Sequence, residues 1–125
     1  MFNAMLVEDN ILFRESLRDS LRLRFPSIEI AEAGNGAEAL EKIDSLPPNL
    51  IFMDIQLPGQ NGLELTEKIK KLHPDIVIII LTNYDIPEYR EAATRFKADY
   101  FFSKDSITLE DIVTLVKPML PTKRV

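Results

Sequence analysis

Short apolar runs alternate with longer stretches of helical spacing along the whole sequence. The runs are too short for buried helices and are bounded by turn-forming residues, which is typical of strands covered on both faces. After the first run, Phe13, Leu17 and Leu21 recur every fourth residue among charged side chains, which indicates an amphipathic helix that ends at Pro26. Five such rounds predict a parallel sheet with helices on both faces. The expected strands cover residues 4–7, 28–32, 50–53, 76–81 and 100–102.

The order of these strands can be narrowed from their polarity. Segment 28–32 alternates apolar with acidic residues, so we expect this strand to have one solvent-exposed face and to lie at the edge of the sheet. Segment 76–81 is the most apolar, so we expect it to be central. Right-handed crossovers leave few possible orders, and the flavodoxin-like order 2-1-3-4-5 fits. The predicted fold is therefore a three-layer α/β/α, doubly wound, five-stranded parallel sheet.

The bulk composition limits the class of protein. The 125 residues fit a single domain, expected over 1–125 with a core of about 4–119. A formal net charge of -5 disfavours direct nucleic-acid binding. The absence of cysteine and the single histidine exclude thiolate and multi-histidine metal sites within this chain. Without a signal-peptide pattern or a long apolar segment, we expect a cytoplasmic protein with no membrane contact.

Carboxylates follow two of the expected strands. Glu8 and Asp9 come directly after the first strand, and Asp54 comes after the third. Strands 1 and 3 are neighbours in the expected order, so these acids should meet at the carboxyl edge, where open α/β sheets bind ligands. Three carboxylates this close repel one another unless a cation lies between them. Oxygen ligands of this kind suit Mg²⁺, and the sequence predicts a magnesium site here.

Two further polar side chains are expected at the same edge. Thr82 closes the fourth strand, and Lys104 follows the fifth. A hydroxyl and an ammonium group are suitable partners for the oxygens of a phosphoryl group. An aspartate in this company can attack phosphorus and form an acyl phosphate. The residues therefore indicate phosphoryl transfer to Asp54, with Thr82 and Lys104 beside it.

Together these residues and their spacing resemble the receiver domain of two-component response regulators, over residues 5 to about 119. The resemblance implies that Asp54 is the phosphoacceptor. It also implies that Asp9, Asp54 and the backbone carbonyl of Gln56 hold Mg²⁺, with Glu8 acting through water. The chain would then be a signalling switch and not an enzyme, limited to self-catalysed phosphotransfer and autodephosphorylation.

The resemblance also implies which residues respond to phosphorylation. Thr82 matches the hydroxyl residue and Lys104 the lysine that bind the new phosphoryl oxygens. Phe101, three residues before Lys104, matches the aromatic residue that rotates on activation, and its neighbour Tyr100 is a second candidate for that role.

Two residues are expected to tune the lifetime of the phosphorylated form. By the same correspondence, Gln56 and Tyr84 lie beside the path by which water reaches phosphorus. The amide of Gln56 can orient this water and favour hydrolysis, whereas the ring of Tyr84 can obstruct it. Because a tyrosine covers far more of this path than an alanine would, we expect the effect of Tyr84 to outweigh that of Gln56 and to lengthen the lifetime of the phosphorylated form.

The resemblance also names the kinds of partner. A sensor histidine kinase or a histidine phosphotransfer protein would donate the phosphoryl group. A downstream effector or output domain would read the face of the fourth helix, fifth strand and fifth helix, and a homodimer is possible. We expect no output domain in this chain, which leaves open a stand-alone regulator or the receiver of a longer one.

Two rival functions remain at this stage. An aspartate-nucleophile phosphohydrolase would use the same metal, but such enzymes usually carry a second acid two residues after the nucleophile, where this chain has Gln56. A receiver-like module that binds partners without phosphorylation is the other rival, and the complete set of acids, hydroxyl and lysine argues against it.

Overall fold

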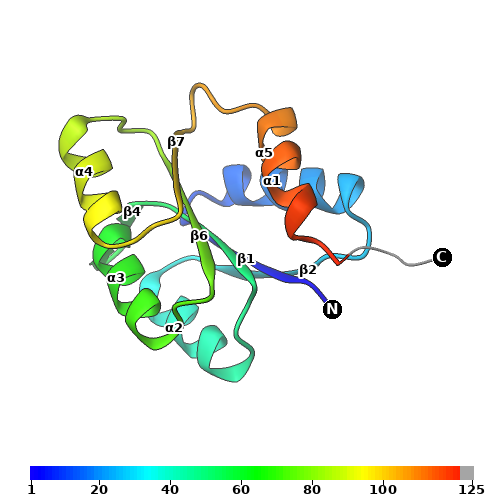
Figure 1. The fold of residues 1–125 in the computed structure, drawn as a ribbon, viewed down its shortest axis with the longest axis horizontal. Helices are drawn as coiled ribbons and strands as arrows, with labels where there is room; N and C mark the ends of the chain where they lie inside the picture. The colour runs from blue at the N-terminus through cyan, green and yellow to red at the C-terminus, as the bar shows by residue number, and fades with distance from the viewer. Residues whose placement is uncertain (122–125) are drawn as a thin grey trace.

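The computed structural model describes residues 1–121 and contains one main sheet with helices on both sides (Figure 1). The main sheet consists of β1 (Asn3–Val7), β2 (Glu29–Ala33), β3 (Leu50–Met53), β6 (Val77–Thr82) and β7 (Tyr100–Ser103). The helices are α1 (Ile11–Arg24), α2 (Gly36–Ser45), α3 (Gly62–Leu72), α4 (Pro87–Arg95), α5 (Leu109–Val116) and the 3-10 helix η1 (Lys117–Met119). None of the helices within residues 1–121 is long and apolar enough to cross a membrane.

The strands of the main sheet are all parallel and follow the order β2-β1-β3-β6-β7. Counted in chain order, this is the predicted order 2-1-3-4-5. The segment 28–32, with its alternating apolar and acidic residues, supplies the edge strand β2, as expected. The most apolar segment supplies β6, which is paired on both sides, although the middle position belongs to β3.

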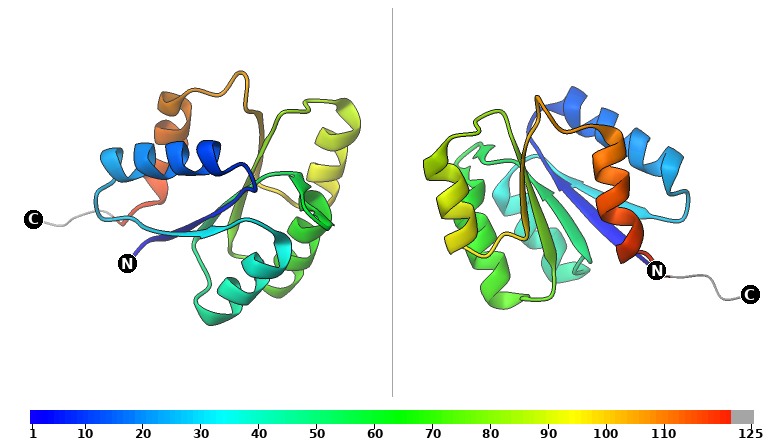
Figure 2. Two further views of the ribbon diagram at one scale, coloured as in Figure 1. Left: turned by 180° about the vertical axis from the view of Figure 1, so that it is seen from behind. Right: turned by 45° about the horizontal axis from the view of Figure 1, so that its top comes forward.

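Two helical layers cover the sheet, which confirms the predicted three-layer architecture. Helices α1 and α5 lie on one face, and α2, α3 and α4 lie on the other (Figures 1 and 2). Successive residues of each interior strand point to opposite faces, so each strand feeds both cores. The α2–α4 core includes Met5, Ile51, Met53, Ile78 and Ile80. The α1–α5 core includes Leu6, Leu50, Phe52, Ile79 and Leu81.

Side-chain caps fix where several helices begin. The Asn10 side chain accepts a hydrogen bond from the Phe13 N–H and starts α1 directly after the acids of β1. Thr108 and Asp111 form the expected capping box of α5. Helix α4 differs, because Ile86 precedes it and supplies no side-chain cap.

A small hairpin, not expected from the sequence, follows β3. Strands β4 (Gln56–Leu57) and β5 (Gln60–Asn61) pair antiparallel around Gly59, whose φ of 73° suits glycine. Gly62 then brings α3 against the end of β3, since a Cβ at this position would lie 1.9 Å from the Asp54 carbonyl oxygen. The start of α3 thus packs closely against the Asp54 backbone.

Candidate functional site

The register of the sheet delivers the acids of β1 and β3 to one edge. The Asp54 N–H donates to the Val7 carbonyl at 3.0 Å, so the pairing of β3 with β1 continues up to the carboxylate. One oxygen each from Glu8, Asp9 and Asp54 lies within 4.8 Å of the others. Glu8 is 5% exposed and Asp54 6% exposed, whereas Asp9 faces solvent. The predicted convergence of the three carboxylates is therefore present.

Lys104 supplies positive charge to this cluster. Its ammonium group forms an ion pair with Glu8 and lies 3.6 Å from Asp54 Oδ2. The side chain is only 7% exposed, and its ammonium group sits 4.4 Å from the centroid of the Phe13 ring. The Lys104 N–H also donates to the Thr82 carbonyl at 2.8 Å, which extends the pairing of β7 with β6. The backbone of Lys104 is therefore fixed by the pairing of β7 with β6.

The cluster carries more negative charge than Lys104 neutralises. Burial and the neighbouring Glu8 carboxylate raise the pKa of Asp54 from 3.8 to about 7, and the pull of Lys104 and of the Gln56 N–H offsets this only in part. The donors are hard carboxylate oxygens on two adjacent strands. Such a set fits a divalent cation like Mg²⁺, which takes one or two carboxylates and keeps several waters.

Gln56 lies beside Asp54 and also contacts α4. Its backbone N–H is 3.4 Å from Asp54 Oδ1, and its side-chain amide is 3.4 Å from the Tyr89 hydroxyl. This contact involves the Gln56 N–H, so the expected role of the Gln56 carbonyl as a metal ligand stays a prediction. The side chain of Gln56 thus links the hairpin that follows β3 to α4.

Thr82 lies at the end of β6 and is fully buried. Its hydroxyl accepts a hydrogen bond from the Tyr84 N–H at 3.1 Å, and none joins it to Asp54 within residues 1–121. The Tyr84 side chain is 52% exposed. Thr82 is thus bonded to the segment that leads into α4.

The two aromatic candidates on β7 face different sides of the sheet. Phe101 is half-buried against the α2–α4 core, and the Arg90 guanidinium lies 4.8 Å from the centroid of its ring. Tyr100 instead stacks with Phe102, whose ring packs against the α1–α5 core. Only Phe101 of the pair therefore contacts α4 through these interactions.

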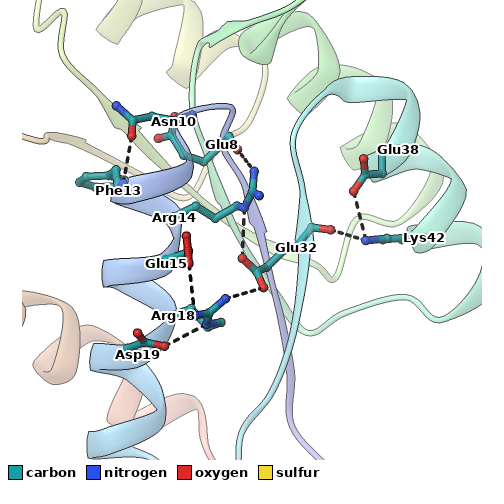
Figure 3. A network of polar contacts seen from close by, with 10 residues as sticks. All are labelled: Glu8, Asn10, Phe13, Arg14, Glu15, Arg18, Asp19, Glu32, Glu38 and Lys42. Atoms are coloured by element: carbon teal, nitrogen blue, oxygen red, sulfur yellow. Dashed lines mark hydrogen bonds and ion pairs between the residues drawn. The ribbon is translucent and has the colours of Figure 1, made fainter.

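Sequence reasoning missed an arginine that touches the acid turn. Arg14 donates to the Glu8 carbonyl oxygen at 2.7 Å and forms an ion pair with Glu32 (Figure 3). In the sequence it is one of several basic residues on the polar side of α1. No local pattern marks it, because its partners belong to other segments.

The space around the carboxylates is small. A hollow of about 10 Å³ borders Glu8 and Asp54, far less than a small-molecule pocket requires. A hollow of about 600 Å³, lined by Met1, Glu29 and Leu46 among others, lies instead near the starts of β1 and β2. The hollow beside these acids is therefore too small to enclose a small-molecule substrate.

Comparisons with known proteins agree with this architecture. Residues 4–117 match the family model described as the response regulator receiver domain. The uncharacterized transcriptional regulatory protein YvfU of Bacillus subtilis is 31% identical over 100% of this chain and 62% of its own length. The response regulator MprA of Mycolicibacterium vanbaalenii is 32% identical over 93% of this chain and 49% of its own length. The chain thus spans less than two thirds of each of these relatives.

A solved structure is similar over nearly the whole chain. The DNA-binding response regulator of the LuxR family from Staphylococcus aureus superposes with a TM-score of 0.86 at 29% identity, covering 94% of this chain and 98% of that one. The sheet order, the three converging carboxylates and the match over residues 4–117 lead to one conclusion. This chain belongs to the response regulator receiver domain family.

Proposed function

We propose that this chain is a phosphoacceptor switch in which Asp54 takes a phosphoryl group from a phosphohistidine. The donor would be a sensor histidine kinase or a histidine phosphotransfer protein. The single observation that carries this proposal is the convergence of Glu8, Asp9 and Asp54 with Lys104 at the end of a receiver-domain sheet. The small size of the hollow beside Asp54 also supports it, because a phosphohistidine presented by another protein needs no enclosed substrate pocket.

In this reaction a carboxylate oxygen of Asp54 attacks phosphorus. The new O–P bond forms as the P–N bond to the donor histidine breaks, and the electron pair of that bond stays on the imidazole. A bound Mg²⁺ would supply positive charge that ionises Asp54 and neutralises the phosphoryl oxygens. Asp9, Asp54 and the Gln56 carbonyl would hold it, with Glu8 acting through water.

Lys104 and Thr82 would bind the product. Lys104 lies close to both Glu8 and Asp54, so a short movement would bring its ammonium group to a phosphoryl oxygen. The Thr82 hydroxyl can donate its proton to a second oxygen while still accepting from the Tyr84 N–H. Any shift of Thr82 would therefore carry the segment before α4 with it.

The response would be read on the face formed by α4, β7 and α5. Phe101 lies under the Arg90 guanidinium, so movement of the segment before α4 would change how this ring packs. The named relatives are regulators, one of them named as transcriptional and another as DNA-binding, which favours an output domain that controls transcription. That domain could belong to the same polypeptide or to another one, and the chain itself would not contact nucleic acid.

Intact mass spectrometry after incubation with Mg²⁺ and acetyl phosphate tests the proposal. We expect one added phosphoryl group on the wild-type chain and none on Asp54→Asn. Asp105→Asn, an exposed acid after Lys104, is the control and should still be modified. An equal adduct on Asp54→Asn would overturn the assignment. Steady phosphate release without an adduct would instead favour the phosphohydrolase, and no reaction at all would favour the inert binding module.

A further inference from the structure

Arg14 holds the backbone of the turn that carries the acids of β1. Its guanidinium donates to the Glu8 carbonyl oxygen at 2.7 Å, and its side chain is only 18% exposed (Figure 3). The Glu8 carboxylate is held separately, by the Asn10 N–H at 3.0 Å and by Lys104. Backbone and side chain of Glu8 are therefore both fixed, and Arg14 is the contact that fixes the backbone from α1.

Glu32, near the carboxyl end of β2, anchors Arg14. Arg14 Nε lies 3.1 Å from Glu32 Oε1, and Arg18 Nη1 lies 3.2 Å from Glu32 Oε2. Burial opposes ionisation, yet the hydrogen bonds from Arg18 and Arg14 outweigh it and hold the pKa of Glu32 below its ordinary value. Glu32 is therefore a charged carboxylate that binds two arginines of α1.

The backbone of Glu32 is tied to the opposite layer. The Lys42 ammonium contacts the Glu32 carbonyl oxygen and also pairs with Glu38 on the same helix, α2 (Figure 3). Glu32 thus connects α1, the edge strand and α2, which lie on different layers of the fold. An anchor held from both faces restricts the positions that Arg14 can take.

The charges of this network suit a neighbouring cation site. An unpaired arginine beside three carboxylates would compete with a metal ion by repulsion. Glu32 neutralises Arg14, so the guanidinium can hold the turn without adding net positive charge beside it. Hydrogen-bonded partners of this kind commonly orient the groups that bind a metal.

We infer that Arg14, anchored by Glu32, is a positioning residue for the Mg²⁺ site and keeps the Glu8–Asp9 turn where its carboxylates meet Asp54. The inference rests on the proposed function. It concerns neither a metal ligand nor a phosphoryl-binding group, because Arg14 contacts a backbone carbonyl and a distant carboxylate.

Calorimetric titration of Mg²⁺ into the purified chain provides the test. Arg14→Met keeps the length of the side chain and removes both contacts, and it should weaken Mg²⁺ binding about tenfold. Glu32→Gln should weaken it about threefold, because it leaves Arg14 charged and loosely held. The double variant should bind like Arg14→Met alone, since Glu32 acts through Arg14. Arg22→Met is the matched control on α1, forms no ion pair within residues 1–121, and should bind like the wild type.

The rate of modification by acetyl phosphate separates positioning from other roles. At low Mg²⁺ the Arg14→Met rate should fall with the loss of affinity, and at saturating Mg²⁺ it should return to within about twofold of the wild type. A variant that melts earlier but binds Mg²⁺ as tightly as the wild type would overturn the inference and leave the proposed function intact. If Arg14→Met does not fold, unchanged affinity in Glu32→Gln has the same meaning. A wild-type chain that neither binds Mg²⁺ nor becomes modified would overturn the proposed function itself.

Discussion

The two sides of the rim are built differently. On one side, the turn from β1 into α1 contains a buried Glu8, and Asn10, Arg14 and Lys104 all hydrogen-bond or pair with it. On the other side, residues 83–86 between β6 and α4 are all exposed. Helix α4 begins without a side-chain cap and buries only Ala92 and Ala93.

The difference separates a rigid binding half from a responsive half. Segments with few buried contacts and exposed backbone open at low free energy, whereas a buried, fully bonded turn opens only with the rest of the domain. In the proposed switch, a rigid acid turn would keep the metal site formed before any ligand arrives. In the same proposal, the exposed β6–α4 segment would change position for the small energy that a new phosphoryl contact supplies.

The largest expected effect concerns the Asp54 carboxylate, which follows β3 and lies against Glu8 of the acid turn. The pKa of Asp54 is raised from 3.8 to about 7 in the folded chain, so the folded chain binds this proton more tightly than the unfolded chain. The stability that this proton adds is present below pH 4 and is lost as the pH rises through 7. At pH 8, with a chelator present to remove divalent metal, Asp54→Asn should therefore raise the free energy of unfolding by about 2 kcal/mol. Urea unfolding between pH 4 and pH 8 measures this.

A matched carboxylate from the exposed half supplies the control. The hydrogen bond from Arg90 holds the pKa of Asp85 below its ordinary value, so Asp85→Asn should not stabilise the chain at pH 8. Saturating Mg²⁺ should shrink the advantage of Asp54→Asn, since the metal would neutralise the carboxylates. Equal stabilisation by both variants would mean that the cost of the negative charge is not localised at the carboxylate cluster of Glu8, Asp9 and Asp54.

The same substitution at one arginine on each side tests the comparison of rigidity. Arg14→Met removes a partly buried hydrogen bond and ion pair, and it should lower the free energy of unfolding by about 1–2 kcal/mol. Arg90→Met removes an exposed pair with Asp85 and a contact with Phe101, and it should change stability by less than about 0.5 kcal/mol. Chemical denaturation of both variants measures the difference, and a larger loss in Arg90→Met would reverse the assignment of the two halves.

The smallest expected effect is on the lifetime of the phosphorylated chain. Tyr84 lies in the exposed half, and removing its ring in Tyr84→Ala should admit water and shorten the lifetime a few-fold, because about 1 kcal/mol changes a rate roughly fivefold. Gln56→Ala is the companion variant and should lengthen the lifetime by removing an amide that can orient water. Decay of the phosphorylated mass after removal of the donor records both. An unchanged lifetime in Tyr84→Ala would place the tyrosine away from the path of water.

The main elements and the acid cluster followed from local pattern. The expected strand 50–53 is observed as Leu50–Met53, and the expected 76–81 is observed as Val77–Thr82. Strands buried on both faces need continuous apolar runs, and such runs are visible in any sequence. Because parallel strands end at one edge, the residue that follows each run could be placed there without knowledge of the packing. The β4–β5 hairpin was missed, because its pairing of two residues per strand leaves no periodic signal.

The supports of the site were decided by tertiary structure alone. Helix α1 carries Arg14, Arg18, Arg22 and Arg24, and nothing in their spacing indicates that only the first reaches the Glu8 carbonyl. The partner Glu32 is 18 residues from Arg14 and belongs to another element. Apolar periodicity determines which side of a helix is buried, but the docking angle and rotation of that helix on the sheet determine where each long cationic side chain can reach. The sequence alone thus determined which groups meet at the rim, and only the packing of α1 against the sheet decided which arginine braces them.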